Sequence, residues 1–194
     1  MKEISELKLD DKLKTIKSNI MKLKALGIEN YYCANILDWF NEVLEKNYII
    51  HESKINDSKI DQEIFKKYRQ KVYWINFGKN IGSEFRDYHY AVVLYESKYT
   101  AIVVPLTSKK DESPQWIIDN ENVIVDLGEA KGYPHECKQC YACTFLLQSV
   151  SKKRLDRCGN KKDGYFDLKL SSEQMNKICD KIKEIAYNTI DIKS

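Results

Sequence analysis

The stretch between residues 72 and 109 holds the side chains best suited to chemistry. A loop with the sequence Gly-Ser-Glu at 82–84 precedes a β-type run that opens at His89, and the following run ends in Pro-Leu-Thr-Ser at 105–108. The unperturbed pKa of a histidine is about 6.5, so His89 can accept or donate a proton near neutral pH. Taken without its neighbours, this histidine is better explained as a hydrogen-bonded residue at a strand edge.

A second cluster of potential ligands lies between residues 135 and 158. Cys137 and Cys140 have the CxxC spacing of a zinc knuckle, and His135, Cys143 or Cys158 could complete a tetrahedral set. A second CxxC arm is missing, however, and Cys143 falls inside a predicted strand. Alternation along that strand would send Cys140 and Cys143 to opposite faces. We therefore expect no metal here, with a zinc site kept as the alternative.

These residues must be positioned by short strands. Runs rich in β-branched and aromatic residues predict strands at 71–77, 89–95, 100–106, 122–126 and 141–150, with turn-like residues between them. Several short strands in close succession favour a small barrel over a parallel sheet. Tyr73, Trp74, Tyr88 and Tyr90 in these strands are candidates for stacking on a planar ligand such as a nucleic-acid base. Because side chains alternate along a strand, about half of the four are expected in the core.

Helices are predicted on both sides of the strands. Before them, a helix capped by Asp10 or Asp11 and ended by Gly27 is followed by a second helix after Asn30, and together they form a helical hairpin. Residues 51–61 are polar and predict a loop, and a short helix is predicted near 62–68. After the strands, Ser171 and Gln174 form a capping box that opens a helix with one apolar stripe.

The order of these features closely resembles that of the MazF/PemK toxins. In that family a strand leads to a GSE-type loop, a basic residue opens the next strand, and the third strand ends in a P-[IL]-T-S motif. Residues 149–155 (SVSKKRL), followed by a C-terminal helix, resemble the closing part of the same family. The resemblance covers about residues 70–190, and it rests on five elements in the right order rather than on any one motif.

The resemblance implies an α+β fold with a small SH3-like β-barrel and a C-terminal helix in residues 71–194, preceded by a helical extension in residues 1–70. It also implies a homodimer that cuts single-stranded RNA sequence-specifically, uses no metal or other cofactor, and is bound by a cognate antitoxin. Such enzymes drive the ribose 2′-OH onto the adjacent phosphate and leave a 2′,3′-cyclic phosphate and a 5′-OH. This chemistry needs a base, an acid and donors to the crowded phosphorane.

Carried over residue by residue, the resemblance assigns roles within the 72–109 stretch. Where the family usually has Arg-Pro, this chain has His89 and Tyr90; a histidine is the better proton shuttle but the weaker permanent cation. Arg86 is expected to restore the missing charge. The expected catalytic residues are therefore His89, Thr107, Ser83 and Arg86, with the hydroxyls of Thr107 and Ser83 donating to the phosphate. The expected substrate-binding residues are Glu84, Ser108 and Lys109, and Glu84 either orients Arg86 or caps the loop.

Two alternatives to a nuclease remain open. Replacement of the usual arginine by His89 would also mark a catalytically inactive member of the fold that binds RNA or a protein. A zinc-stabilised interaction protein is the other alternative. The helical extension could cover a groove as an antitoxin would, enlarge the dimer interface, or pack on the barrel; packing is the expected role.

Composition agrees with a globular protein. The chain has 194 residues, of which 31% are charged, and its net charge of +3 permits nucleic-acid binding without requiring it. No stretch approaches the roughly 18 apolar residues that a membrane helix needs. The first residues hold no apolar segment of the secretory type. We therefore expect a cytoplasmic protein with no membrane contact.

Overall fold

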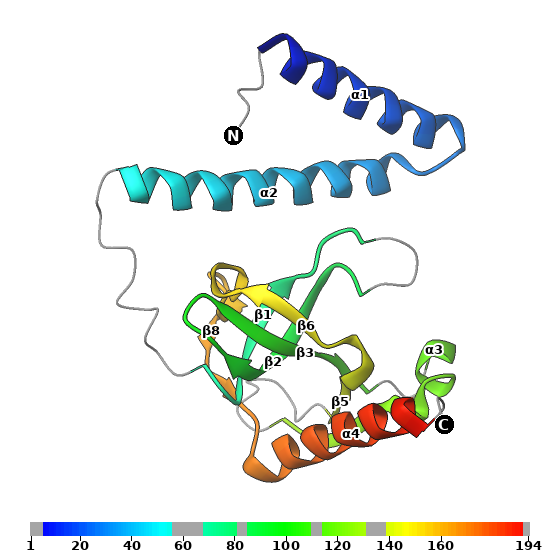
Figure 1. Ribbon diagram of the computed structural model, residues 1–194, viewed down its shortest axis with the longest axis vertical. Coiled ribbons are helices and arrows are strands. Elements are labelled where there is room, and N and C mark those ends of the chain that lie inside the picture. The colour runs from blue at the N-terminus through cyan, green and yellow to red at the C-terminus, as the bar shows by residue number, and fades with distance from the viewer. Residues whose placement is uncertain (1–5, 56–67, 81–84, 110–113, 131–138, 192–194) are drawn as a thin grey trace. The chain divides into compact units, whose positions relative to one another are not determined.

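A computed structural model of the chain describes residues 6–55, 68–80, 85–109, 114–130 and 139–191 (Figure 1). The chain divides into two compact units, Met1–Ile55 and Asn56–Ser194. The first contains α1 (Glu6–Ala25) and α2 (Asn30–Ile55). The described part of the second opens with β1 (Lys71–Asn76), β2 (Tyr88–Glu96), β3 (Thr100–Ser108) and α3 (Gln115–Ile118). The remaining elements of the second unit are η2 (Glu121–Val123), β4 (Ile124–Glu129), β5 (Gln139–Cys143), η3 (Thr144–Leu146), β6 (Gln148–Ser151), η4 (Lys152–Arg154), β7 (Cys158–Asn160), β8 (Gly164–Phe166), β9 (Leu168–Lys169) and α4 (Ser172–Asp191).

The first unit is the predicted helical hairpin. Gly27 ends α1 as expected: it has a φ of 77°, and the N–H of Ile28 donates to the carbonyl of Leu23 at 3.2 Å. This is the Schellman arrangement, in which a left-handed residue closes the helix. The predicted cap at Asp10 or Asp11 is wrong, because α1 already begins at Glu6. The residues that precede the aspartates are good helix formers and extend the helix backwards.

The second helix is longer than the sequence suggested. It runs to Ile55, so the predicted loop at 51–61 is wrong for residues 51–55. A hydrogen bond of 3.1 Å from the Tyr48 hydroxyl to the Glu52 carboxylate, one turn apart, supports the additional turns. Residues 56–61 and nearly all of the predicted short helix at 62–68 lie outside the described residues. Across all the described ranges, no helix combines the length and the apolar character that crossing a membrane requires.

The described strands of the second unit form a seven-stranded sheet in the order β4-β5-β3-β2-β1-β9, with β6 also paired to β3, and a separate β7-β8 hairpin. Every pairing is antiparallel. The sheet curls into a half-barrel, and α4 runs alongside it (Figure 1). The prediction of an α+β fold with a small barrel, a C-terminal helix and a preceding helical hairpin is therefore confirmed.

One predicted strand is interrupted. Residues 141–150 were expected to be continuous, but β5 and β6 are separated by η3. Both strands pair with β3: Ala142 opposes Leu106, and Gln148 opposes Val103. Between these two pairs the chain advances by three residues on β3 but by six from β5 to β6. The additional residues between β5 and β6 do not pair with β3 and form the short 3-10 helix η3. Local residue preferences cannot reveal this insertion, because it follows from the pairing with β3.

The sheet carries a hydrophobic core on each face. On one face, Met175 and Ile178 of α4 pack with buried residues of the sheet, including Val92 and Val104. On the other face, a second cluster is formed by the buried residues Ile75, Phe77, Ala91, Val93, Ala101, Val103 and Val150. The start of β2 and the end of β3 extend beyond this second cluster, and their residues are only partly buried or exposed.

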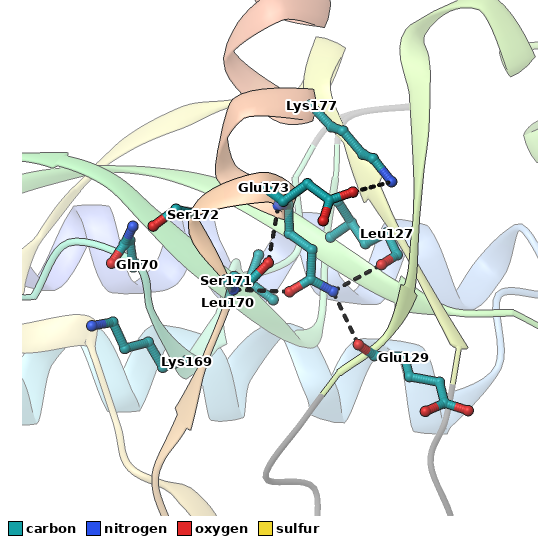
Figure 2. Close-up of a pocket in the computed structure, with 10 residues that line it drawn as sticks. Gln70, Leu127, Glu129, Lys169, Leu170, Ser171, Ser172, Glu173 and Lys177 are labelled. Atoms are coloured by element: carbon teal, nitrogen blue, oxygen red, sulfur yellow. Dashed lines mark hydrogen bonds and ion pairs between the residues drawn. The ribbon is translucent and has the colours of Figure 1, made fainter.

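The N-terminus of α4 is attached to the edge strand β4 (Figure 2). The predicted capping box is confirmed: the N–H of Ser171 donates to Oε1 of Gln174 at 2.9 Å, and the N–H of Gln174 donates to Oγ of Ser171 at 3.1 Å. Nε2 of Gln174 also donates to the carbonyls of Leu127 at 2.8 Å and Glu129 at 3.0 Å. One glutamine therefore caps the helix and occupies two carbonyls of the edge strand.

Candidate active site

The candidate site lies where β2 begins and β3 ends. On β2, His89 faces Ile75 of β1, and the next residue, Tyr90, pairs with Leu106 of β3. Continuing this register outward by one residue sets His89 opposite Thr107. Side chains of directly opposed residues share a face, with Cβ atoms about 5 Å apart. By this register, the two residues that the sequence made central lie on the same face of the sheet at neighbouring positions.

His89 has surroundings suited to proton transfer. Its side chain is half-buried, and the ring centroid lies 4.4 Å from that of Phe85. Burial lowers the pKa of His89 from its ordinary value, while the nearby Asp87 carboxylate and a hydrogen bond with the Arg86 backbone act in the opposite direction. The net effect lowers the pKa of His89, which favours the neutral imidazole, the form that can accept a proton.

The loop between β1 and β2 is anchored at both ends. The amide of Asn80 donates to the carbonyls of Phe77 at 3.1 Å and Phe85 at 2.6 Å. Lys79 forms an ion pair with Asp87, whose N–H donates to the carbonyl of Gly78. These contacts hold residues 85–87, which lead into β2, against the end of β1, and they thereby fix the backbone just before His89.

The other predicted members of the loop divide into two groups. Arg86 is described and its side chain is exposed, three residues before His89. Ser83 and Glu84 lie outside the described residues, so their expected roles stay predictions.

Thr107, at the end of β3, and Lys109, just after it, lie at the site, whereas Ser108 does not. Thr107 pairs with Tyr141 on β5, and Tyr141 in turn pairs with Asp126 on β4. Lys109 forms an ion pair with Asp126, with its Nζ 3.3 Å from Oδ2 of that carboxylate. Ser108 pairs with a buried residue of β5 and lies on the opposite face of β3 from Thr107, because side chains alternate along a strand. The geometry does not bring Ser108 to the site.

Two residues of this region were missed by the sequence reasoning. Tyr141 and Asp126 are far from residues 72–109 in the sequence and carry no motif. Only the registers of β3 with β5 and of β5 with β4 place them in line with Thr107. The one available signal was that both stand in predicted strands.

The aromatic side chains lie mainly on the other face. Trp74 stacks on Tyr88, with ring centroids 5.8 Å apart and planes at 14°, and lies 4.7 Å from Tyr90. Trp74 pairs with Tyr90 on the strand next to it, so this cluster shares the face opposite to that of His89. Tyr73 packs against the core on the face of His89, and burial raises its pKa. Tyr88 is 47% exposed, so it is the member of the cluster most open to solvent.

The cysteines in the described part of the cluster are buried. Burial raises the pKa of Cys140 to about 11 and those of Cys143 and Cys158 to about 12, which disfavours the thiolates that bind zinc. The thiol of Cys158 donates to a β1 carbonyl at 3.2 Å. Within the ranges that the structure describes, no three His, Cys, Asp or Glu side chains are placed to hold a metal. His135 and Cys137 lie outside those ranges.

A cleft of 690 Å³ lies elsewhere, at the N-terminus of α4. Figure 2 shows its lining, which includes Lys169, Glu129 and the ion pair of Glu173 with Lys177. None of the described residues that the sequence nominated for catalysis or substrate binding lines it. The cleft is therefore a separate feature, whose walls are tied together by the glutamine that caps α4.

The comparison with protein families decides the identity of the fold. The family described as PemK-like, MazF-like toxin of type II toxin-antitoxin system matches residues 68–186. The chain belongs to this toxin family. The match contains every predicted site residue and leaves out α1 and α2, so the helical hairpin is an N-terminal extension to the PemK-like, MazF-like part. A search of curated proteins finds no match.

Proposed function

We propose that this PemK-like toxin is a sequence-specific, metal-independent endoribonuclease that cleaves single-stranded RNA in the bacterial cytoplasm. One observation carries the proposal: Tyr90 pairs with Leu106 where β2 begins and β3 ends, and this register, continued by one residue, sets the half-buried His89 opposite Thr107. They lie beside a loop that supplies an arginine. A base, a hydrogen-bond donor and a cation are the groups that attack of a 2′-OH on a phosphate requires.

The proposed reaction needs no group beyond these side chains. His89 accepts the proton of the ribose 2′-OH, and the 2′-oxygen forms a bond to the adjacent phosphorus. The bond from phosphorus to the 5′-oxygen then breaks, and the proton held by His89 is available to the leaving oxygen. Thr107 donates a hydrogen bond to the phosphorane, and Arg86 contributes the positive charge that a neutral histidine lacks. Ser83 is a second donor in this proposal. The products are a 2′,3′-cyclic phosphate and a 5′-OH.

The first experiment is an RNA-cleavage assay in EDTA with wild-type protein and two histidine variants. His89→Ala is expected to lower the cleavage rate by roughly 10²- to 10⁴-fold, the usual contribution of general acid–base catalysis. His51→Ala is the matched control, since His51 is an exposed residue of α2. Its rate should equal that of the wild type, and the products of both should carry cyclic phosphate ends. Full activity of His89→Ala would remove His89 from the mechanism.

A catalytically inactive binding protein is the second candidate. The observation that favours it is the same substitution of histidine for the family's usual arginine, because a neutral His89 provides no permanent charge for the phosphate. Wild-type protein that binds single-stranded RNA or a protein partner and never cleaves RNA would favour this candidate over the nuclease.

Two partners complete the proposal. A type II toxin is controlled by a cognate antitoxin, so we expect this protein to be inhibited by a separate antitoxin chain. We also expect a homodimer. Light scattering of the purified protein tests the homodimer, and co-expression with the product of a neighbouring small gene tests the antitoxin.

A further inference from the structure

The face that carries His89 and Thr107 continues across two further strands. Thr107 on β3 pairs with Tyr141 on β5, which pairs with Asp126 on β4. Neighbouring strands lie about 4.8 Å apart, so these side chains form a row that leads away from His89. Lys109 stands two residues beyond Thr107, just past the end of β3 and about 7 Å further along the chain. The candidate site therefore extends into a second patch, formed by Lys109, Asp126 and Tyr141.

The contacts within this patch hold a cation beside an aromatic ring. Nζ of Lys109 lies 3.3 Å from Oδ2 of Asp126 and 5.7 Å from the ring centroid of Tyr141. Oδ1 of Asp126 accepts a hydrogen bond of 2.8 Å from the N–H of Gly128, which orients the carboxylate. Asp126 and Tyr141 raise the pKa of Lys109, so the amine remains charged.

The patch is open enough to take a ligand. The side chains of Lys109 and Asp126 are 40% and 50% exposed, and an exposed ion pair of this kind contributes at most about 1 kcal/mol. A phosphate can therefore share or replace Asp126 as the partner of Lys109 at small cost. An aromatic ring with an adjacent cation is the combination that single-stranded nucleic acids use, with the base on the ring and the phosphate on the cation.

We propose that Lys109 and Tyr141 form a subsite for one nucleotide next to the cleaved phosphate. Tyr141 stacks on the base, Lys109 binds the phosphate, and Asp126 holds Lys109 over the ring before RNA arrives. This subsite rests on the proposed action on RNA and adds residues of β4 and β5 to the site. Its continuity with the row that contains Thr107 favours RNA over a protein ligand.

The test measures binding of a labelled, fully 2′-O-methylated single-stranded RNA, which cannot be cleaved, by fluorescence anisotropy over a range of salt concentrations. Tyr141→Leu is expected to weaken binding by roughly 5- to 150-fold, the usual effect of losing one stacked base. Tyr141→Phe keeps the ring and loses only the hydroxyl that interacts with Lys109, so it should retain most of the affinity that Tyr141→Leu loses. Lys109→Ala should weaken binding and make the salt dependence of log K shallower by about 0.7, the loss of one phosphate contact.

A matched control lies at the opposite end of the β2-β3 hairpin. Nζ of Lys98 lies 5.1 Å from the ring centroid of Tyr99, and Tyr99 is exposed. This Lys–Tyr pair reproduces the local chemistry away from the site, so Lys98→Ala and Tyr99→Leu should leave RNA affinity unchanged. Thermal unfolding of all variants establishes that they are folded.

The outcomes separate the subsite from the nuclease activity. If the wild type binds RNA but never cleaves it, the proposed nuclease is overturned and the subsite stands on the binding data. Affinity that is unchanged in Lys109→Ala and Tyr141→Leu overturns the subsite alone, and so does an equal loss in the control variants. Variants that bind RNA normally but lose the antitoxin would make the patch a protein-docking surface. A wild type that binds no RNA overturns both proposals.

Discussion

The attachment of α4 to β4 through Gln174 can be tested quantitatively. Replacing Gln174 with alanine removes three side-chain hydrogen bonds: one accepted from the N–H of Ser171 and two donated to the carbonyls of Leu127 and Glu129. One of the three is partly buried and two are exposed. The partly buried hydrogen bond, to the carbonyl of Leu127, should contribute about 1 kcal/mol and each of the two exposed ones about 0.5 kcal/mol. Gln174→Ala should therefore lower the free energy of unfolding by about 2 kcal/mol.

Two further variants divide this value between the cap and the strand. Ser171→Ala removes the hydroxyl that accepts the N–H of Gln174 and should cost about 1 kcal/mol, the usual loss of an N-cap. Gln174→Glu retains the acceptor for the N–H of Ser171 but donates nothing to the two β4 carbonyls, and its charge faces them. It should therefore be nearly as destabilising as alanine, although a glutamate in this position normally completes a capping box.

The assay is urea denaturation followed by far-UV circular dichroism, at equal protein concentration for all variants. Gln115→Ala is the control: it removes an exposed glutamine of α3 whose amide contacts Asp119, the residue that follows this short helix, and it should leave the midpoint almost unchanged. The reasoning is refuted if Gln174→Glu is as stable as the wild type, because the contacts with β4 would then contribute nothing. It is also refuted if Gln174→Ala costs no more than the control.

Two other predictions concern pH and the backbone. His89 must be neutral to accept a proton. The value of kcat/KM for RNA cleavage should therefore be constant at and above neutral pH and fall as the pH drops through the pKa of His89. Burial lowers this pKa, so the midpoint of the fall should lie below the ordinary histidine value near 6.5. His89→Arg should lack this acid limb, and an unchanged profile in that variant would exclude His89 as the titrating group. Gly159→Ala should destabilise the β7-β8 hairpin strongly, because the residue has a φ of 94° and its new Cβ would lie 2.2 Å from the carbonyl oxygen of Gly164. Gly27→Ala, at a φ of 77° with no atom within 4 Å of the added carbon, should cost only about 1–2 kcal/mol by thermal unfolding, and equal losses in the two variants would contradict this account.

Much of the fold could be predicted from the sequence because its signals are local. Alternation and residue type indicated the positions of β1, β2 and β3, and the Ser-x-x-Gln pattern indicated the start of α4. Errors arose where longer-range contacts override such signals. The chain between β5 and β6 leaves the ladder because both strands pair with β3, and α2 continues through residues that are polar enough to suggest a loop.

The candidate site divides in the same way. By itself, the sequence determined which residue types stand at the ends of β2 and β3, and the order of its motifs was enough to indicate the toxin family. Only the tertiary structure decided the register of β2 with β3, which sets Thr107 opposite His89 when it is continued by one residue. The pairing of β3 with β5 then places Tyr141 beside Thr107 and Ser108 on the other face. The physical reason is that strand register depends on how whole faces of the sheet pack, and a shift of one residue would send every side chain of a strand to the opposite face.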